Sequence, residues 1–197
     1  VSEYFNDLFW ITNPAYFFNM QNFQYTQDTI DAELKKSKED FILHFRSAYT
    51  DGYPPAWMIA EILPLGLLCR IYTNLKDNVI KKRVAQHFGL QVPVFSSWIV
   101  ILAGLRNMCC HHCRTWNREL ATITTEPRRT KFGWIDSSRT DKRRMYYRIC
   151  MIRYFLYTVS PNNNFKDKLK ALLAAYPNID TAAMGFPSDW ENEDIWK

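Results

Sequence analysis

Two adjacent histidines, His111 and His112, follow an Arg-Asn pair, Arg106 and Asn107, within a seven-residue run. Histidine suits proton transfer at neutral pH because its ordinary pKa is about 6.5. Arginine suits a phosphate because its planar guanidinium meets two oxygens and offsets the charge that develops in a transition state. Together these groups could make a ribose 2′-OH attack its own phosphate. We therefore interpret all four as candidate catalytic residues for RNA cleavage without a metal ion.

The cysteines among these histidines leave three alternatives open. A zinc site needs four converging ligands, but on one helix only pairs such as Cys109 and Cys113 converge, and no second CxxC-type pair exists. A histidine could activate Cys110 or Cys113 as a nucleophile, although a cysteine within a helix is usually a small core residue. The whole cluster could also be a satisfied polar network, which is costly to bury. We predict neither a metal site nor a cofactor.

The element that carries the cluster is expected to be a helix from Pro93 to about Arg118. At about 100° per residue, Asn107, His111, Arg114 and Arg118 would share one face. We expect Arg114 and Arg118 to extend an anion-binding groove from the histidine. The most apolar stretch, residues 92–105, is too short to cross a bilayer, so we interpret it as a buried helix of a protein without a membrane segment.

The net charge of +5 is unevenly distributed along the 197 residues. Residues 105–153 carry 12 basic and 4 acidic side chains, whereas residues 1–40 and 186–197 carry net charges of −4 and −3. This excess of arginine predicts a surface for a polyanion, most simply RNA. We expect four arginines to bind the RNA backbone: Arg128, Arg129, Arg143 and Arg144. A solvated face without a ligand is the alternative.

The remaining signals are helical, and the expected fold is an all-α antiparallel bundle in one domain over residues 1–197. An Arg-rich loop over residues 120–141 precedes the fifth helix, and a tail over residues 179–197 docks through Phe186, Trp190 and Trp196. The other expected helices span residues 27–49, 56–75 with a break at Pro64, 76–88, 142–159 and 164–176. Five cysteines, three of them clustered, fit a reducing cytoplasm better than a disulfide framework.

The run from Arg106 to Arg118 resembles the signature of the Abi-like family, abortive-infection proteins of the AbiD/AbiF type. The segment Tyr53–Glu61 resembles the family's Pro-Pro-x-Trp-Met-x-x-Glu block, and residues 160–169 and 183–190 resemble its C-terminal blocks. The similarity is collinear from about residue 30 to residue 192.

The resemblance implies membership of the HEPN superfamily, whose helical bundles usually dimerise. Two motifs then face each other and form one metal-independent endoribonuclease site that leaves a 2′,3′-cyclic phosphate and a 5′-OH. The motif form favours His111 over His112 as the catalytic histidine. The family also implies defence against phage, in some relatives with a small non-coding RNA. Because relatives typically carry a further N-terminal helical segment, we expect this chain to be the C-terminal part of a longer protein.

Overall fold

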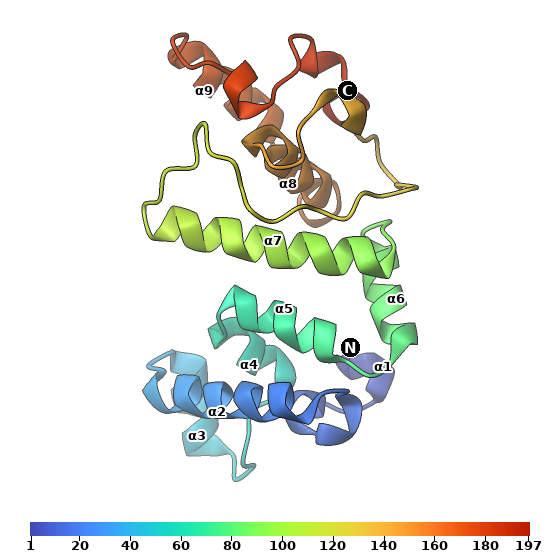
Figure 1. The fold of residues 1–197 in the computed structure, drawn as a ribbon. Coiled ribbons are helices and arrows are strands. Elements are labelled where there is room, and N and C mark those ends of the chain that lie inside the picture. Colours follow the sequence, from blue (N-terminus) through green and yellow to red (C-terminus); the bar gives the residue numbers. More distant parts are fainter. The chain divides into compact units, whose positions relative to one another are not determined.

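The computed structural model describes all residues from Val1 to Lys197. Its nine α-helices and six short 3-10 turns, with one isolated bridge between Phe17 and Leu75, confirm the all-α prediction (Figure 1). The chain forms two compact units, Val1–Arg83 and Val84–Lys197, which are described separately below. The prediction of one domain over the whole chain stays a prediction.

The first unit contains the short helix α1 (Ser2–Phe5), α2 (Met20–Lys36), α3 (Asp40–Ala48), α4 (Ala56–Ile62) and α5 (Leu65–Asn74). Helix α6 (Asn78–His87) spans the boundary between the units. The restart predicted at Pro64 is confirmed, because Pro64 is the N-cap of α5. Gly89, the residue after the helix predicted over residues 76–88, has the left-handed φ of 67° that glycine adopts at low cost.

The single helix predicted over residues 27–49 is wrong, because the chain turns at Ser37 between α2 and α3. The guanidinium of Arg46 on α3 donates a hydrogen bond to the carbonyl oxygen of Leu34, near the end of α2. The turn lets Ile42 and Phe45 of α3 pack against Met58 of α4 in one core cluster. Leu34 of α2 packs against the same cluster. The apolar residues of α2 and α3 therefore face one core, and their spacing continues through the break between the two helices.

The second unit is built on α7 (Val92–Cys110), α8 (Met145–Val159) and α9 (Phe165–Ala175). The ring of Trp98 on α7 packs edge-on against Tyr154 of α8 at 5.5 Å between centroids. The helix-like spacing of Met145, Ile149, Ile152 and Leu156 would place them on one inward face of α8, but only Met145 is buried and the other three are half-buried. The fully enclosed side chains of α8 are those of Tyr146, Tyr147, Arg148, Cys150, Met151 and Tyr154.

The segment after α7 runs back along that helix towards its start (Figure 1). Thr125 donates its amide hydrogen to Ser97 Oγ at 3.1 Å and accepts a hydrogen bond from Trp98 Nε1 at 3.0 Å. Further along, the carbonyl oxygen of Arg129 accepts a hydrogen bond from Gln91 Nε2 at 3.0 Å. These bonds fix the loop in an antiparallel course, so that its later residues lie at the N-terminal end of α7.

The C-terminal tail consists of the turns η4 (Ala182–Met184), η5 (Trp190–Asn192) and η6 (Asp194–Trp196). Phe186, Trp190 and Trp196 are all buried. The indole nitrogen of Trp196 donates a hydrogen bond to the Tyr146 hydroxyl at 3.1 Å. Gly133 lies so close to the tail that a Cβ there would be 2.4 Å from the carbonyl oxygen of Asp194. The tail therefore packs on the start of α8 and on the long loop.

Helix α7 is long and apolar enough to cross a membrane by length and composition alone, a test that core helices of soluble proteins also pass. In this structure Val94, Phe95, Trp98 and Ile101 of α7 are buried.

Candidate functional site

The Arg-Asn and His-His pairs lie at the C-terminal end of α7, which ends at Cys110 with His111 as its C-cap. The amide of His112 donates to the carbonyl oxygen of Cys109 at 3.1 Å, and that of Cys113 donates to Met108 at 2.9 Å. His112, which donates the first of these two bonds, has a positive φ of 53°. These two bonds around a left-handed residue form a Schellman motif, here with histidine in the position that glycine usually occupies.

The predicted continuation of the helix to Arg118 is therefore wrong, and so is the polar stripe through Asn107, His111, Arg114 and Arg118. No proline or glycine marks this end in the sequence; the chain stops because its last carbonyls bond to amides of the turn. Arg114 and Arg118 belong to the irregular segment after the helix. What remains is a group of four residues near the helix end: Arg106 and Asn107 in the last turns of α7, and His111 and His112 directly after it.

All four side chains of this group are exposed. Nη1 of Arg106 donates to Oδ1 of Asn107 at 3.3 Å, which links the guanidinium to the amide. The amide of His111 donates to the backbone oxygen of Asn107 at 3.0 Å. Arg106 makes no ion pair. Its cationic group is thus oriented by an amide and available to an external anion.

The other candidate arginines divide between two places. Arg118 lies beside the start of α8, because the amide of Leu120 donates to the carbonyl oxygen of Arg143 at 2.9 Å. Arg128 and Arg129 lie near the opposite end of α7, since Arg129 is bonded to Gln91. A helix of this length spans about 30 Å, so the structure does not bring this pair to the histidines. Arg114 is exposed in the turn after the helix.

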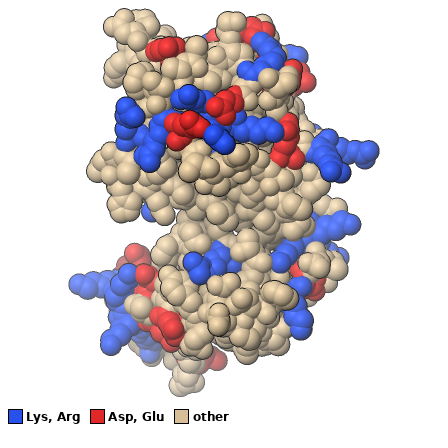
Figure 2. Space-filling model, viewed as in Figure 1, with Lys and Arg blue, Asp and Glu red and all other residues tan.

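Carboxylates already neutralise part of the basic segment. Arg143 pairs with Glu119 at 2.6 Å, Arg144 lies 3.8 Å from Asp141, and Lys142 pairs with Glu126. The acidic tail contributes Asp189 and Glu193, both paired with Arg139. Figure 2 shows basic and acidic side chains next to one another in the upper part of the view. The exposed arginines without an ion pair are Arg106, Arg114, Arg118, Arg128 and Arg129 among the candidates.

The cysteine cluster does not converge with the histidines on a common point. No group of three or more His, Cys, Asp or Glu side chains has a metal-binding arrangement. Cys109, Cys110 and Cys113 are exposed, and none is in a disulfide.

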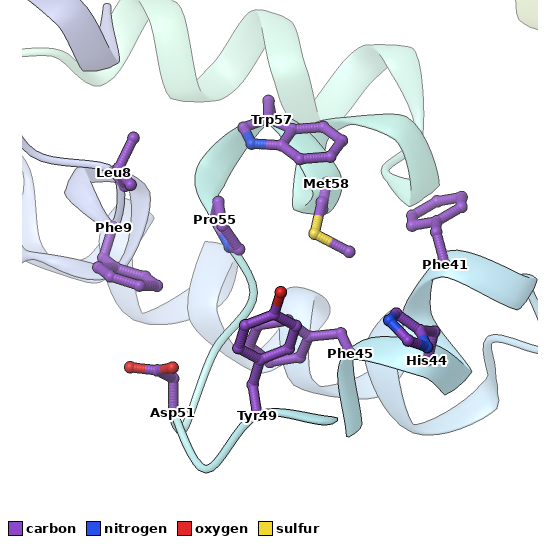
Figure 3. Close-up of a pocket in the computed structure, with 10 residues that line it drawn as sticks. All are labelled: Leu8, Phe9, Phe41, His44, Phe45, Tyr49, Asp51, Pro55, Trp57 and Met58. Carbon is purple, nitrogen blue, oxygen red and sulfur yellow. The ribbon is translucent and has the colours of Figure 1, made fainter. Parts of the chain in front are cut away.

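A second feature is a cavity of about 440 Å³ in the first unit (Figure 3). Its walls are mostly aromatic, with the rings of Phe45 and Tyr49 stacked at 5.2 Å. Pro55, Trp57 and Met58 of the Tyr53–Glu61 block also line it, together with one histidine, His44, and one carboxylate, Asp51. Such a lining suits an apolar group better than a phosphate.

One charged residue of the second unit has an environment that the sequence does not indicate. Arg148 on α8 is completely buried. A helical wheel places a lone arginine outward by default, because buried charge is costly. The only hint in the sequence is that the residues next to Arg148 on α8 are apolar or aromatic, and Tyr146, Tyr147, Cys150 and Met151 among them are buried as well.

A family model described as "Abi-like protein" matches residues 1–117. No curated protein and no solved structure matches the chain. The matched region includes the Tyr53–Glu61 block and ends after the Arg-Asn and His-His pairs at the end of α7. Since it covers more than half of the 197 residues, the protein belongs to the Abi-like family.

Proposed function

We propose that this protein is a cytoplasmic abortive-infection protein that cleaves RNA without a metal ion, as a HEPN-type homodimer. Family membership supports a role in abortive-infection defence. The observation that carries the catalytic part is the exposed group Arg106, Asn107, His111 and His112 at one helix end, with the guanidinium held by the amide.

In the proposed reaction, Arg106 binds the scissile phosphate and offsets its growing negative charge. Asn107 orients Arg106 through the 3.3 Å hydrogen bond. The imidazole of His111 removes the proton of the ribose 2′-OH, whose oxygen forms a bond to phosphorus while the bond from phosphorus to the 5′ oxygen breaks. A second imidazole, His112 or His111 of the other protomer, protonates that 5′ oxygen. The products carry a 2′,3′-cyclic phosphate and a 5′-OH.

The dimer is proposed because one protomer offers only one such group on an open surface. Two copies related by a two-fold axis would face each other through the same patch. That arrangement would shield the phosphate from water and supply both an acid and a base.

A non-catalytic RNA-binding role, for example with a small non-coding RNA, is the second candidate. It is favoured by the arginines that are exposed and unpaired away from the histidines, Arg128 and Arg129. Binding through phosphate contacts of this kind should weaken steeply with salt. Both functions predict such binding, so binding alone does not separate them.

The test is cleavage of single-stranded RNA in the presence of EDTA. The enzyme should cleave, and Arg106→Ala and His111→Ala should each remove the activity. His87→Ala is the matched control, since His87 is an exposed histidine at the end of another helix, α6. RNA that is bound but never cut by the parent protein, or cleavage that survives both substitutions, would reject the catalytic proposal.

A further inference from the structure

A cavity of about 230 Å³ lies in the second unit between α7, the returning loop and α8. Val100, Gly104 and Met108 form its α7 side, one helical turn apart. A Cβ added at Gly104 would meet no atom within 4 Å. The absence of a side chain at this glycine therefore leaves the space open.

Two arginines reach this cavity, Arg118 from the loop and Arg148 from α8. Arg118 is exposed and makes no ion pair. Leu120 on the loop adds an apolar wall. The cavity therefore combines two cations with an apolar lining and contains no carboxylate.

Arg148 lacks a charged partner inside the protein. Its Nη2 donates to the carbonyl oxygen of Thr122, and its Nη1 lies 3.7 Å from the sulfur of Met151. Its Nε has no hydrogen-bond partner, although the residue is completely buried. Desolvation lowers the pKa of the guanidinium, but an arginine stays charged in proteins. A buried, unpaired charge of this kind is costly unless an anion compensates it.

We propose that this cavity binds a phosphate group through Arg148 and Arg118. Because Arg148 has no exposed surface, the cavity wall must shift slightly for a phosphate oxygen to reach its guanidinium; another oxygen of the same phosphate can then accept from the exposed Arg118. The apolar walls suit the ribose or base that carries a phosphate. Met108, which lines the cavity, stands two positions after Arg106 on α7, so their side chains leave the helix about 160° apart, and an RNA chain would have to bend round the helix to reach both.

This phosphate has two sources, the backbone of RNA and a free phosphate or nucleotide. Only the first source rests on the proposed function. We would titrate the full chain with inorganic phosphate and with AMP by calorimetry. In parallel, labelled single-stranded RNA would be titrated by anisotropy against the Arg106→Ala protein, in which cleavage does not disturb the binding curve.

Three variants test the cavity from its three sides: Arg118→Gln, Arg148→Met and Gly104→Leu, which fills the open space. We expect each arginine variant to weaken phosphate binding about tenfold or more, the value of a lost charge-assisted contact, and Gly104→Leu to weaken it by a similar factor by occupying the cavity. The controls are Arg70→Gln and Gly66→Leu. Gly66 is also an exposed helical glycine with open space at its Cβ position. Circular dichroism checks folding, and if Arg148→Met does not fold, the other two variants decide.

A parallel loss of RNA affinity in the cavity variants would identify the RNA backbone as the source. Unchanged RNA affinity with lost phosphate and AMP affinity would identify a free anion. Absence of phosphate and AMP binding, or binding that all the variants retain, would overturn the proposal. Cavity-dependent binding by a protein that cleaves no RNA would preserve this inference and reject only the nuclease activity.

Discussion

The amide of His112 donates to the carbonyl oxygen of Cys109 at 3.1 Å, and this bond holds a histidine in the left-handed region that glycine normally occupies at a helix end. A side chain in this conformation costs roughly 1 kcal/mol relative to glycine. Strain of this kind tends to be retained where a side chain has a function. The bond therefore connects the end of α7 to the position of an imidazole in the proposed active site.

Replacing His112 with glycine should make the protein more stable. The new residue adopts the φ of 53° without a Cβ clash, so we expect the free energy of unfolding to rise by about 0.5–1 kcal/mol. Urea unfolding followed by circular dichroism measures this change. If His112 supplies the proton to the 5′ oxygen, the same substitution will lower the cleavage rate while it stabilises the fold.

His111→Gly is the matched comparison. His111 has a φ of −92°, which any residue adopts. Glycine there should bring no relief of strain and should lower stability slightly, through its greater freedom in the unfolded chain. Equal stabilisation by both substitutions would show that the left-handed backbone is not the cause.

Mixing two inactive variants should restore activity if the site is shared between protomers. A dimer of one Arg106→Ala chain and one His111→Ala chain keeps one composite site in which the arginine and the histidine come from different chains. With random exchange, about half of the dimers are mixed, and each holds one arginine and one histidine at its single shared site, so up to roughly half of the parent rate is expected. The RNA cleavage assay in EDTA gives the readout. An inactive mixture of variants that do exchange subunits would place both groups in one chain.

The parts of this fold that follow from local rules could be predicted from the sequence. Pro64 and Gly89 mark helix boundaries because proline lacks an amide hydrogen and glycine tolerates positive φ. The end of α7 could not be predicted in this way, because the residues at Cys110 to Cys113 include no such signal and the stop depends on backbone bonds. The turn at Ser37 could not be predicted either. The helices on its two sides pack on a common core, so the apolar spacing in the sequence runs on as if there were one helix.

The candidate site shows the same limit of sequence patterns. Arg106, Asn107, His111 and His112 are close in the chain, so the sequence places them all near one helix end, and the contact between Arg106 and Asn107 is a local one. The grouping of Arg118 with Arg148 depends on the loop returning along α7, which no periodicity indicates. The ion pairs of Arg143 with Glu119 and of Arg144 with Asp141 likewise form only in the folded chain, so the sequence does not indicate that these two arginines are neutralised.

The docked tail should loosen in acid through the pair of Arg139 and Asp189. Hydrogen bonds from the guanidinium hold the pKa of Asp189 below its ordinary value. The pair therefore stabilises the folded tail above about pH 4, and this contribution is lost as the pH falls through the lowered pKa. Fluorescence of the tail tryptophans, Trp190 and Trp196, would follow the change. In Arg139→Gln the pair is already absent, so the fluorescence change between about pH 5 and 2 should be smaller.

Gly133→Ala should also detach the tail, for a steric reason. Its Cβ would lie 2.4 Å from the carbonyl oxygen of Asp194, a backbone atom that cannot rotate away. Overpacking of this kind costs about 1–3 kcal/mol, measurable as a lower urea midpoint. Gly52→Ala is the control, since a Cβ there meets nothing within 4 Å. Equal stability of the two variants would show that the tail does not pack tightly on the loop.

Replacing Arg148 with methionine should separate stability from ligand binding. Removal of a buried charge without a charged partner ends its desolvation penalty, and methionine keeps a similar length and fills the space. We expect the ligand-free variant to be more stable than the parent by about 1 kcal/mol. Inorganic phosphate should then raise the melting temperature of the parent, because it binds only the folded state, and leave that of Arg148→Met unchanged. A variant that is strongly destabilised without phosphate, and still responds to phosphate as the parent does, would show that Thr122 and Met151 satisfy Arg148 and that no anion is needed.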